Sequence, residues 1–285
     1  MRGDGRPVGV VTPSPGNESP VWSPDGARIA YVSGAGLADS DIWVSSVGSG
    51  RLARLTRGAG LDAYPAWSPD GSSIAWTSER RGRLGIWVMA GDGSRKRALT
   101  RGPNDAHLAW SPDGRRIAYF DVATGSLELV GFAGGAPRRL SGPAEQSGPA
   151  APAWSPDGRQ IAVSAAGGAL YSVAADGTGA RRLTPRGRSL IAWRPVWSPT
   201  GGAIAFLDLA DHGALVVVSS SGRVLRRLVP RTDAISAPSW SPDGRALAFA
   251  DAGHHIGIVA ADGRRRRTIT HQLDDDADPA WRPSS

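Results

Sequence analysis

The chain has 285 residues and no cysteine, and its 33 lysine and arginine residues against 26 aspartate and glutamate residues give a formal net charge of +7. The lack of cysteine excludes disulfides and thiolate metal sites. No apolar run approaches the roughly 20 residues of a membrane-spanning helix, so a transmembrane segment is excluded as well.

One short motif, Trp-Ser-Pro-Asp-Gly, recurs along the chain at intervals of 41 to 45 residues, with Thr200 in place of aspartate in one copy and Trp-Arg-Pro at the end. A fixed period of about 40 to 45 residues is typical of the blades of a β-propeller. The motif residues are Trp22, Asp25, Gly26, Trp67, Asp70, Gly71, Trp110, Asp113, Gly114, Trp154, Asp157, Gly158, Trp197, Gly201, Trp240, Asp243, Gly244 and Trp281.

Each repeat is predicted to contain four short strands separated by turn signals. In the second repeat they lie at 64–68, 72–78, 83–89 and 95–100. Helix signals are weak because proline and glycine interrupt every window of helical length. We therefore expect an all-β chain, a single β-propeller domain over 1–285 with four-stranded antiparallel blades, whose repeats lie at about 18–56, 62–100, 105–140, 150–184, 193–230 and 236–271.

The motif itself is predicted to be architectural. Proline presets the second position of a type I turn, aspartate suits the third, and glycine accepts the positive φ that follows. Such a turn joins antiparallel strands. The tryptophan before the turn is expected to fill the gap between neighbouring blades.

These repeats resemble the TolB-like β-propeller family, a WD-repeat-like group named for its Pro-Asp turn. The resemblance rests on Pro-x-Trp-Ser-Pro-Asp-Gly-x-x-Ile-Ala-aromatic, on Asp-Ile-Trp-Val at 41–44 and on Arg-x-Leu-Thr at 97–100, and it covers nearly the whole chain. It implies a non-catalytic propeller that binds a protein or peptide near its channel mouth, as TolB binds a lipoprotein. It also implies a bacterial periplasmic or secreted location.

The chain ends are predicted to add strands to the six complete blades. Residues 6–12 read as a fourth strand and 278–283 as a first strand, so the two termini would form a partial closing blade. The alternative is that six blades close by themselves. No secretory signal precedes the first repeat. We therefore expect a true start upstream of Met1, and the compartment stays open.

Sequence motifs for catalysis are absent. There is no Gly-x-Ser-x-Gly and no His-Glu-x-x-His, and Lys96 lies outside any phosphate-binding loop. We therefore expect no enzyme activity, no resident metal and no cofactor. The acidic run 274–278 could hold a calcium ion through carboxylate oxygens, but it lacks the spacing of a calcium loop.

The segments before the first strands carry the candidate binding residues. Most of their acids stand three to five residues before the repeated tryptophan, so the repeat would place them at one level around the channel mouth as a ring of negative potential. The alternative is that they are ordinary solvated turn residues. The candidate partner-binding residues are Glu18, Asp62, Tyr64, Asp105, His107, Arg194, Asp233, Asp276 and Asp278.

Arginines cluster on the predicted fourth strands, where charge deters edge-to-edge pairing. Their spread around a circumference argues against nucleic-acid binding. We expect the protein to be a monomer. Three functions stay open: a protein-interaction scaffold, a metal-assisted hydrolase or lyase acting on a small substrate in the central channel, and a sensor module. The scarcity of asparagine, with only Asn17 and Asn104, argues against the enzyme.

Overall fold

The computed structural model describes residues 18–34, 39–58, 60–102, 104–140, 151–187, 189–223, 225–231, 237–251, 253, 255–270 and 279–283. Within these residues the chain forms six four-stranded antiparallel sheets, so the predicted fold class is confirmed. Short 3₁₀ helices lie at η2 (Ala166–Gly168) and η3 (Leu209–Asp211). No helix in the described part is long and apolar enough to span a membrane.

The chain divides into two compact units of three sheets each, an N-terminal unit drawn mainly from 7–139 with 282–285 and a C-terminal unit drawn mainly from 140–281. That residues 1–285 form one domain therefore stays a prediction. Residues 6–12 and 278 lie outside the described residues, and 279–283 form no strand.

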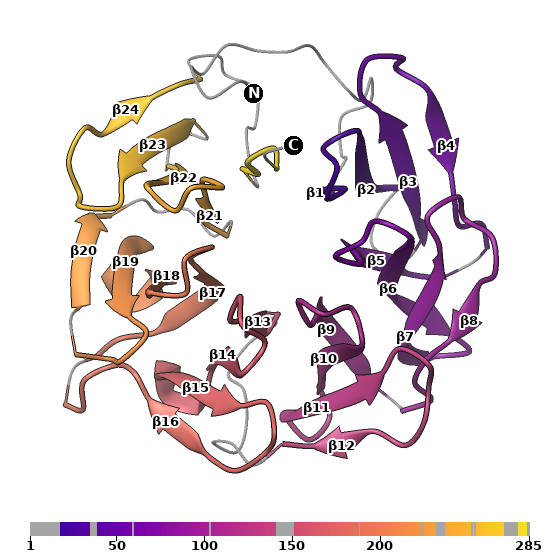
Figure 1. The fold of residues 1–285 in the computed structure, drawn as a ribbon, viewed down its shortest axis with the longest axis horizontal. Coiled ribbons are helices and arrows are strands. Elements are labelled where there is room, and N and C mark those ends of the chain that lie inside the picture. The colour runs from indigo at the N-terminus through magenta and orange to yellow at the C-terminus, as the bar shows by residue number, and fades with distance from the viewer. Residues whose placement is uncertain are drawn as a thin grey trace. The chain divides into compact units, whose positions relative to one another are not determined.

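In every sheet the strands pair in chain order, with the first strand at one edge and the fourth at the other (Figure 1). The strands of the N-terminal unit are β1 (Glu18–Trp22), β2 (Arg28–Gly34), β3 (Ser40–Ser46), β4 (Leu52–Arg54), β5 (Asp62–Trp67), β6 (Ser73–Arg80), β7 (Arg83–Ala90), β8 (Arg97–Ala98), β9 (Asp105–Trp110), β10 (Arg116–Asp121), β11 (Ser126–Gly131) and β12 (Arg138–Arg139). Those of the C-terminal unit are β13 (Ala153–Trp154), β14 (Gln160–Ser164), β15 (Leu170–Ala174), β16 (Ala180–Arg182), β17 (Ala192–Trp197), β18 (Ala203–Asp208), β19 (Ala214–Ser219), β20 (Leu225–Val229), β21 (Ser239–Trp240), β22 (Ala246–Ala250), β23 (Ile256–Ala260) and β24 (Arg267–Thr268).

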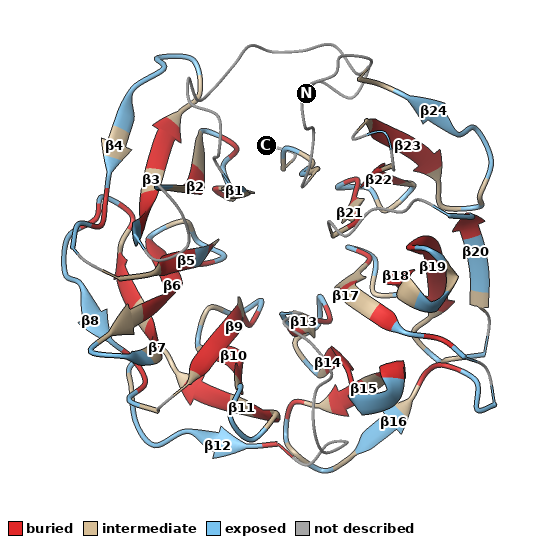
Figure 2. Cartoon of the chain, turned by 180° about the vertical axis from the view of Figure 1, so that it is seen from behind, coloured by how far each residue is buried: buried red, intermediate tan, exposed pale blue. Residues whose placement is uncertain are grey.

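Burial increases from the fourth strand to the middle strands of each sheet (Figure 2). In β6 six consecutive residues are buried, which requires a neighbour on both faces, and the strand accordingly shows no alternation of buried and exposed residues. The fourth strands β8, β12 and β24 are exposed. Their arginines therefore lie in water, where charge protects an open sheet edge.

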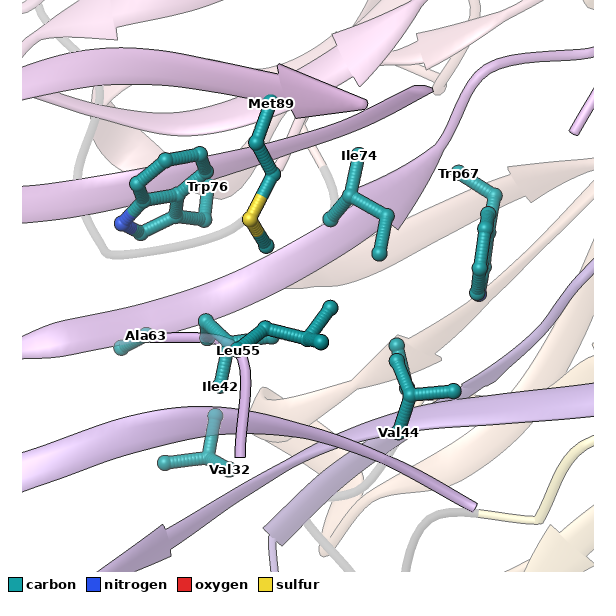
Figure 3. Close-up of a cluster of buried hydrophobic side chains, with 10 residues drawn as sticks. Val32, Ile42, Val44, Leu55, Ala63, Trp67, Ile74, Trp76 and Met89 are labelled. Atoms are coloured by element: carbon teal, nitrogen blue, oxygen red, sulfur yellow. The ribbon is translucent and has the colours of Figure 1, made fainter. Parts of the chain in front are cut away.

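One core cluster of the N-terminal unit fills the space between its first two sheets (Figure 3). Side chains of β2 and β3 meet those of β5, β6 and β7. Trp76 and Ile74 are fully buried, and Met89 packs beside them. The members labelled in Figure 3 are Val32, Ile42, Val44, Leu55, Ala63, Trp67, Ile74, Trp76 and Met89. Large apolar side chains thus join one sheet to the next.

The repeated motif forms a tight turn held by its own side chains. The N–H of Gly26, at φ 63°, donates to the Ser23 carbonyl at 2.8 Å. The Ser23 hydroxyl donates to Asp25 Oδ1 at 2.5 Å, and the N–H of Ala27 donates to the same oxygen at 3.0 Å. These bonds, chiefly the serine hydroxyl, hold the pKa of Asp25 below its usual range. The set recurs at the turn aspartates Asp70, Asp113, Asp157 and Asp243.

The motif tryptophans pack between sheets, and some also bond across to the preceding sheet. Trp110 Nε1 donates to the carbonyl of Ala66 at 3.1 Å, and Trp240 Nε1 donates to that of Val196 at 3.1 Å. Trp281 Nε1 makes the same kind of bond to Ser239 at 3.0 Å, although no strand surrounds it. The indole N–H groups of Trp67 and Trp197 are buried without a hydrogen-bond partner in the described structure.

The fifth copy of the turn allows the contribution of the turn aspartate to stability to be tested. Thr200 replaces it, and its hydroxyl lies 3.0 Å from that of Ser198. We expect Thr200→Asp to stabilise the protein by about 1 kcal/mol at pH 7, because a carboxylate can also accept from the backbone N–H two residues on. Urea unfolding compared with Thr200→Ser measures this gain.

The stabilisation expected from Thr200→Asp should depend on pH. An aspartate whose pKa is depressed on folding stabilises the fold above its unfolded pKa of about 3.9, and this stabilisation is lost as pH falls through the lower folded value. Equal stability of the Asp and Ser variants at pH 7 would show that the turn carboxylate contributes nothing.

Candidate functional site

Four first strands contain a bulge at the same position, three residues before the motif tryptophan. There Ser19, Tyr64, His107 and Arg194 adopt positive φ values of 52°, 54°, 56° and 48°. The strand registers shift at each of these points, so two first-strand residues oppose one second-strand residue. That opposing residue is aromatic in every case: Tyr31, Trp76, Tyr119 or Phe206.

Local sequence explains how the bulges are tolerated. Pro20, Pro65 and Pro195 directly follow three of the bulge residues. Proline has no N–H to donate to a ladder, so it fits a bulge on an edge strand. A left-handed conformation in a residue other than glycine costs about 1 kcal/mol or more, and such strain is concentrated at ligand-binding positions. The bulge residues are therefore candidate binding residues.

Two bulge residues meet across neighbouring sheets of the N-terminal unit. The rings of Tyr64 and His107 lie 5.0 Å apart, centroid to centroid, with an interplanar angle of 51°. Tyr64 is 38% exposed, whereas His107 is 8% exposed. The pair thus consists of an exposed aromatic side chain that rests on a buried ring. This geometry suits recognition of a partner through an amphipathic ring.

Asp62 differs from the expectation of an acid facing the channel mouth, because it is 1% exposed. Its Oδ1 accepts from Trp76 Nε1 at 2.9 Å and from the Ser78 hydroxyl at 2.5 Å. Its Oδ2 accepts from Arg80 Nη2 at 3.0 Å. A buried carboxylate must be paired in this way. Asp62 therefore ties three side chains of β6 to β5.

Asp105 occupies the same repeat position in the next sheet and is also buried, at 3% exposure. The backbone N–H of Gly102 donates to its Oδ2 at 2.9 Å. Burial raises the pKa of Asp105, and the carboxylates of Asp121 and Glu128 add to the effect. The two acids thus share a position but not an environment, and neither contributes the exposed negative rim that we expected.

The other candidate residues are placed differently. Glu18 is exposed at the start of β1, and Arg194 is half-buried in β17 of the C-terminal unit. Asp233, Asp276 and Asp278 lie outside the described residues. That these residues bind a partner stays a prediction. Ser19 belongs with the bulge residues although it was not among the candidates, and the recurring proline two residues before the motif tryptophan is the signal that points to it.

The described residues do not supply a metal site. No three histidine, aspartate or glutamate side chains within them converge closely enough to hold an ion. The acidic run 274–278, where we considered calcium, lies outside the described part. His255 pairs only with Asp251, at 3.4 Å from Nδ1 to Oδ1. We therefore derive no chemistry through a metal.

Comparison of the sequence with known protein families agrees with the repeat pattern and the six sheets. Residues 8–150 match the TolB beta propeller domain family. The chain belongs to this family. No curated protein is similar enough in sequence to add a more specific relative. Family membership thus explains the four-stranded antiparallel sheets as propeller blades.

Solved structures with the same propeller fold include two TolB chains and one enzyme. TolB from Acinetobacter baumannii has 22% identity and a TM-score of 0.60, over 94% of this chain and 57% of that one. The putative TolB from Agrobacterium tumefaciens has 21% identity and a TM-score of 0.55, over 89% and 80%. An oligogalacturonate lyase in complex with manganese has 16% identity and a TM-score of 0.57, over 72% and 64%.

These likenesses establish the fold. The chain spans just over half the length of the Acinetobacter TolB, and all identities are low. Because one propeller fold carries unrelated functions, function has to be argued from the site.

Proposed function

We propose that this TolB-like propeller is a non-catalytic binding module that recognises a protein or peptide through its first-strand bulge residues. The observation that carries the proposal is the contact between the strained residues Tyr64 and His107, whose ring centroids lie 5.0 Å apart. Strain persists only where the surrounding structure imposes it, and binding sites are where such positions concentrate.

The chemistry of the bulge residues supports this proposal. Tyr64 is one of the few large apolar or aromatic residues in the described part that is more than a third exposed. Tyrosine offers contact area and a hydroxyl at a low cost in conformational entropy. Arg194 adopts the same bulge conformation in β17 of the C-terminal unit, and tyrosine and arginine are the types that dominate protein-binding energies.

The observations support an enzyme less well than they support a binding module. An oligogalacturonate lyase in complex with manganese shares the fold. In this chain Asp62 and Asp105, which stand two residues before the bulge residues Tyr64 and His107, are buried and already hydrogen-bonded. The family resemblance supports a location in the bacterial cell envelope, and this location, like a monomeric state, stays a prediction.

Site-specific crosslinking tests the proposal. A photoreactive phenylalanine analogue at position 64 should give a discrete adduct in an extract of the cells that make the protein. The matched control carries the same analogue at Leu52, which is 37% exposed on the fourth strand β4. We expect no adduct from position 52.

Competition makes the test quantitative. Excess unlabelled wild-type protein should suppress the adduct, and Tyr64→Ala should compete about tenfold less well, as expected of a central tyrosine. Val122→Ala, at a residue 52% exposed, should compete like wild type. If Tyr64→Ala competes as well as wild type, the bulge is not the binding surface.

A further inference from the structure

The groove between the sheets β13–β16 and β17–β20 contains an open cavity of about 460 Å³. Both sheets belong to the C-terminal unit (Figure 1). Its lining includes the motif tryptophan Trp197 and the turn residues Asp157 and Gly201, together with Gln160, Ser172 and Arg181. A cavity of this size is within the range of small-ligand sites.

The equivalent groove between the first two sheets shows what can fill such a space. There the guanidinium of Arg28 lies 4.4 Å from the ring centroid of Trp67. Its Nη2 donates to the Gly71 carbonyl at 3.2 Å and its Nη1 to the Gly91 carbonyl at 3.0 Å. A cation over an indole face, bonded to turn carbonyls, is a favourable arrangement.

A second motif tryptophan is also covered by an arginine, which comes from a distant part of the chain. Arg282 lies with its guanidinium carbon 5.8 Å from the ring centroid of Trp22, and its Nε donates to the Gly26 carbonyl at 3.0 Å. Residues 279–283 around it form no strand. An arginine on an irregular segment is therefore sufficient to cover a motif tryptophan and to bond its turn carbonyl.

The groove beside Trp197 keeps the turn carbonyl that Arg28 uses at Gly71 but has no arginine at the position of Arg28, and the carbonyl of Ser220, which corresponds to that of Gly91, accepts from Arg181. Gln160 stands six residues after its motif tryptophan, at the position of Arg28, and its carboxamide oxygen accepts from the Ser172 hydroxyl. Gly201 has φ 73°, so the turn that presents its carbonyl is preserved. Trp197 is only partly buried, whereas Trp67 is 7% exposed.

The local charges are compatible with one added cation. The Ser155 hydroxyl and the Arg159 backbone hold the pKa of Asp157 below its usual range, so this carboxylate is ionised at neutral pH. The guanidinium of Arg181 is turned to the carbonyls of Ser220 and Ser221, at 2.6 and 2.5 Å. A planar, weakly hydrated guanidinium fits between an indole face and carbonyl oxygens better than a compact ammonium does.

We propose that this groove, here named the Trp197 groove, binds the guanidinium of an arginine side chain on an extended segment of a partner protein. The arginine would stack on Trp197, donate to the Gly201 carbonyl and lie near Asp157. It would thereby reproduce what Arg28 and Arg282 do elsewhere in this chain. The Trp197 groove is a different surface from the bulge residues, so its test stands apart from that of the proposed function.

Titration of ¹⁵N-labelled protein with the peptide acetyl-Ala-Arg-Pro-amide tests the proposal. We expect the indole N–H signal of Trp197, assigned with Trp197→Phe, to shift with a Kd of about 1 mM, the affinity reasonable for one cation–π contact with hydrogen bonds. The same peptide with lysine should bind at least tenfold more weakly. Free arginine binding as tightly as the peptide would overturn the assignment to a partner segment.

Two substitutions at one position complete the experiment. Gln160→Arg restores the internal arginine and should reduce peptide binding at least tenfold, with a folded spectrum retained. Gln160→Ala leaves the groove open and should bind within threefold of wild type. If Gln160→Arg binds as wild type does, or if the Trp197 signal does not move, the groove does not take an arginine.

Discussion

Replacing Trp76 by alanine is expected to lower the free energy of unfolding by about 5 kcal/mol, the upper end for a buried tryptophan. Its side chain is fully buried between the first two sheets of the N-terminal unit (Figure 3). The substitution leaves a cavity and also removes the indole N–H donated to Asp62 at 2.9 Å. A buried carboxylate oxygen that loses a donor adds to the penalty.

Urea unfolding followed by circular dichroism measures this loss. Trp76→Phe is the matched control, because it keeps much of the volume but removes the N–H, and it should cost about 2 kcal/mol. A loss below 2 kcal/mol for Trp76→Ala would mean that the core between these sheets collapses around the missing ring. The prediction, which assumes that the two sheets keep their positions around the cavity, would then be wrong.

Asp62→Ala is expected to lower the free energy of unfolding by about 3 kcal/mol. The change leaves the Trp76 and Ser78 donors without their acceptor and breaks the 3.0 Å pair with Arg80. Removing one partner of a buried ion pair costs about 3–5 kcal/mol, and the lower end applies because the Arg80 side chain is 35% exposed and partly solvated. Thermal and urea unfolding at pH 7 check it.

Asp105→Asn is the comparison variant, because it separates the effect of burying an acid from the effect of its bonds on stability. It changes an acid at the same repeat position, and there burial raises the pKa of the carboxyl. A raised folded pKa means that proton binding stabilises the fold below the unfolded pKa of about 3.9, and that this stabilisation is lost as pH rises through the folded value. Asp105→Asn removes that dependence, so at pH 7 it should be at least as stable as wild type. A loss as large as that of Asp62→Ala would contradict this account.

The fold could be predicted because its signals are local and repeated. The turn at Ser23 to Gly26 depends on bonds within five residues, and the same bonds recur at each full copy of the motif. The arginines of β12 lie in water because the fourth strand is a sheet edge. A pattern repeated at a constant interval leaves few alternatives to stacked sheets of equal size.

The site could be predicted only in part. Tyr64, His107 and Arg194 were identified by their place before the motif tryptophan, and all three adopt the bulge conformation. Asp62 and Asp105 were identified by the same reasoning and are buried. Charge alone does not tell which face of a first strand a side chain occupies, since a bulge reverses the alternation along the strand.

The sequence by itself determined the number of repeats, the strand order within each and the turn chemistry, because these depend on neighbours a few residues apart. Only the tertiary structure decided which acids are buried, which bulge residues touch, and that Trp197 faces a groove with Gln160 at the position of the arginine that covers Trp67. The last two of these outcomes depend on side chains about 40 residues apart meeting across two sheets. Packing and desolvation in that shared space, rather than any local preference, set the result.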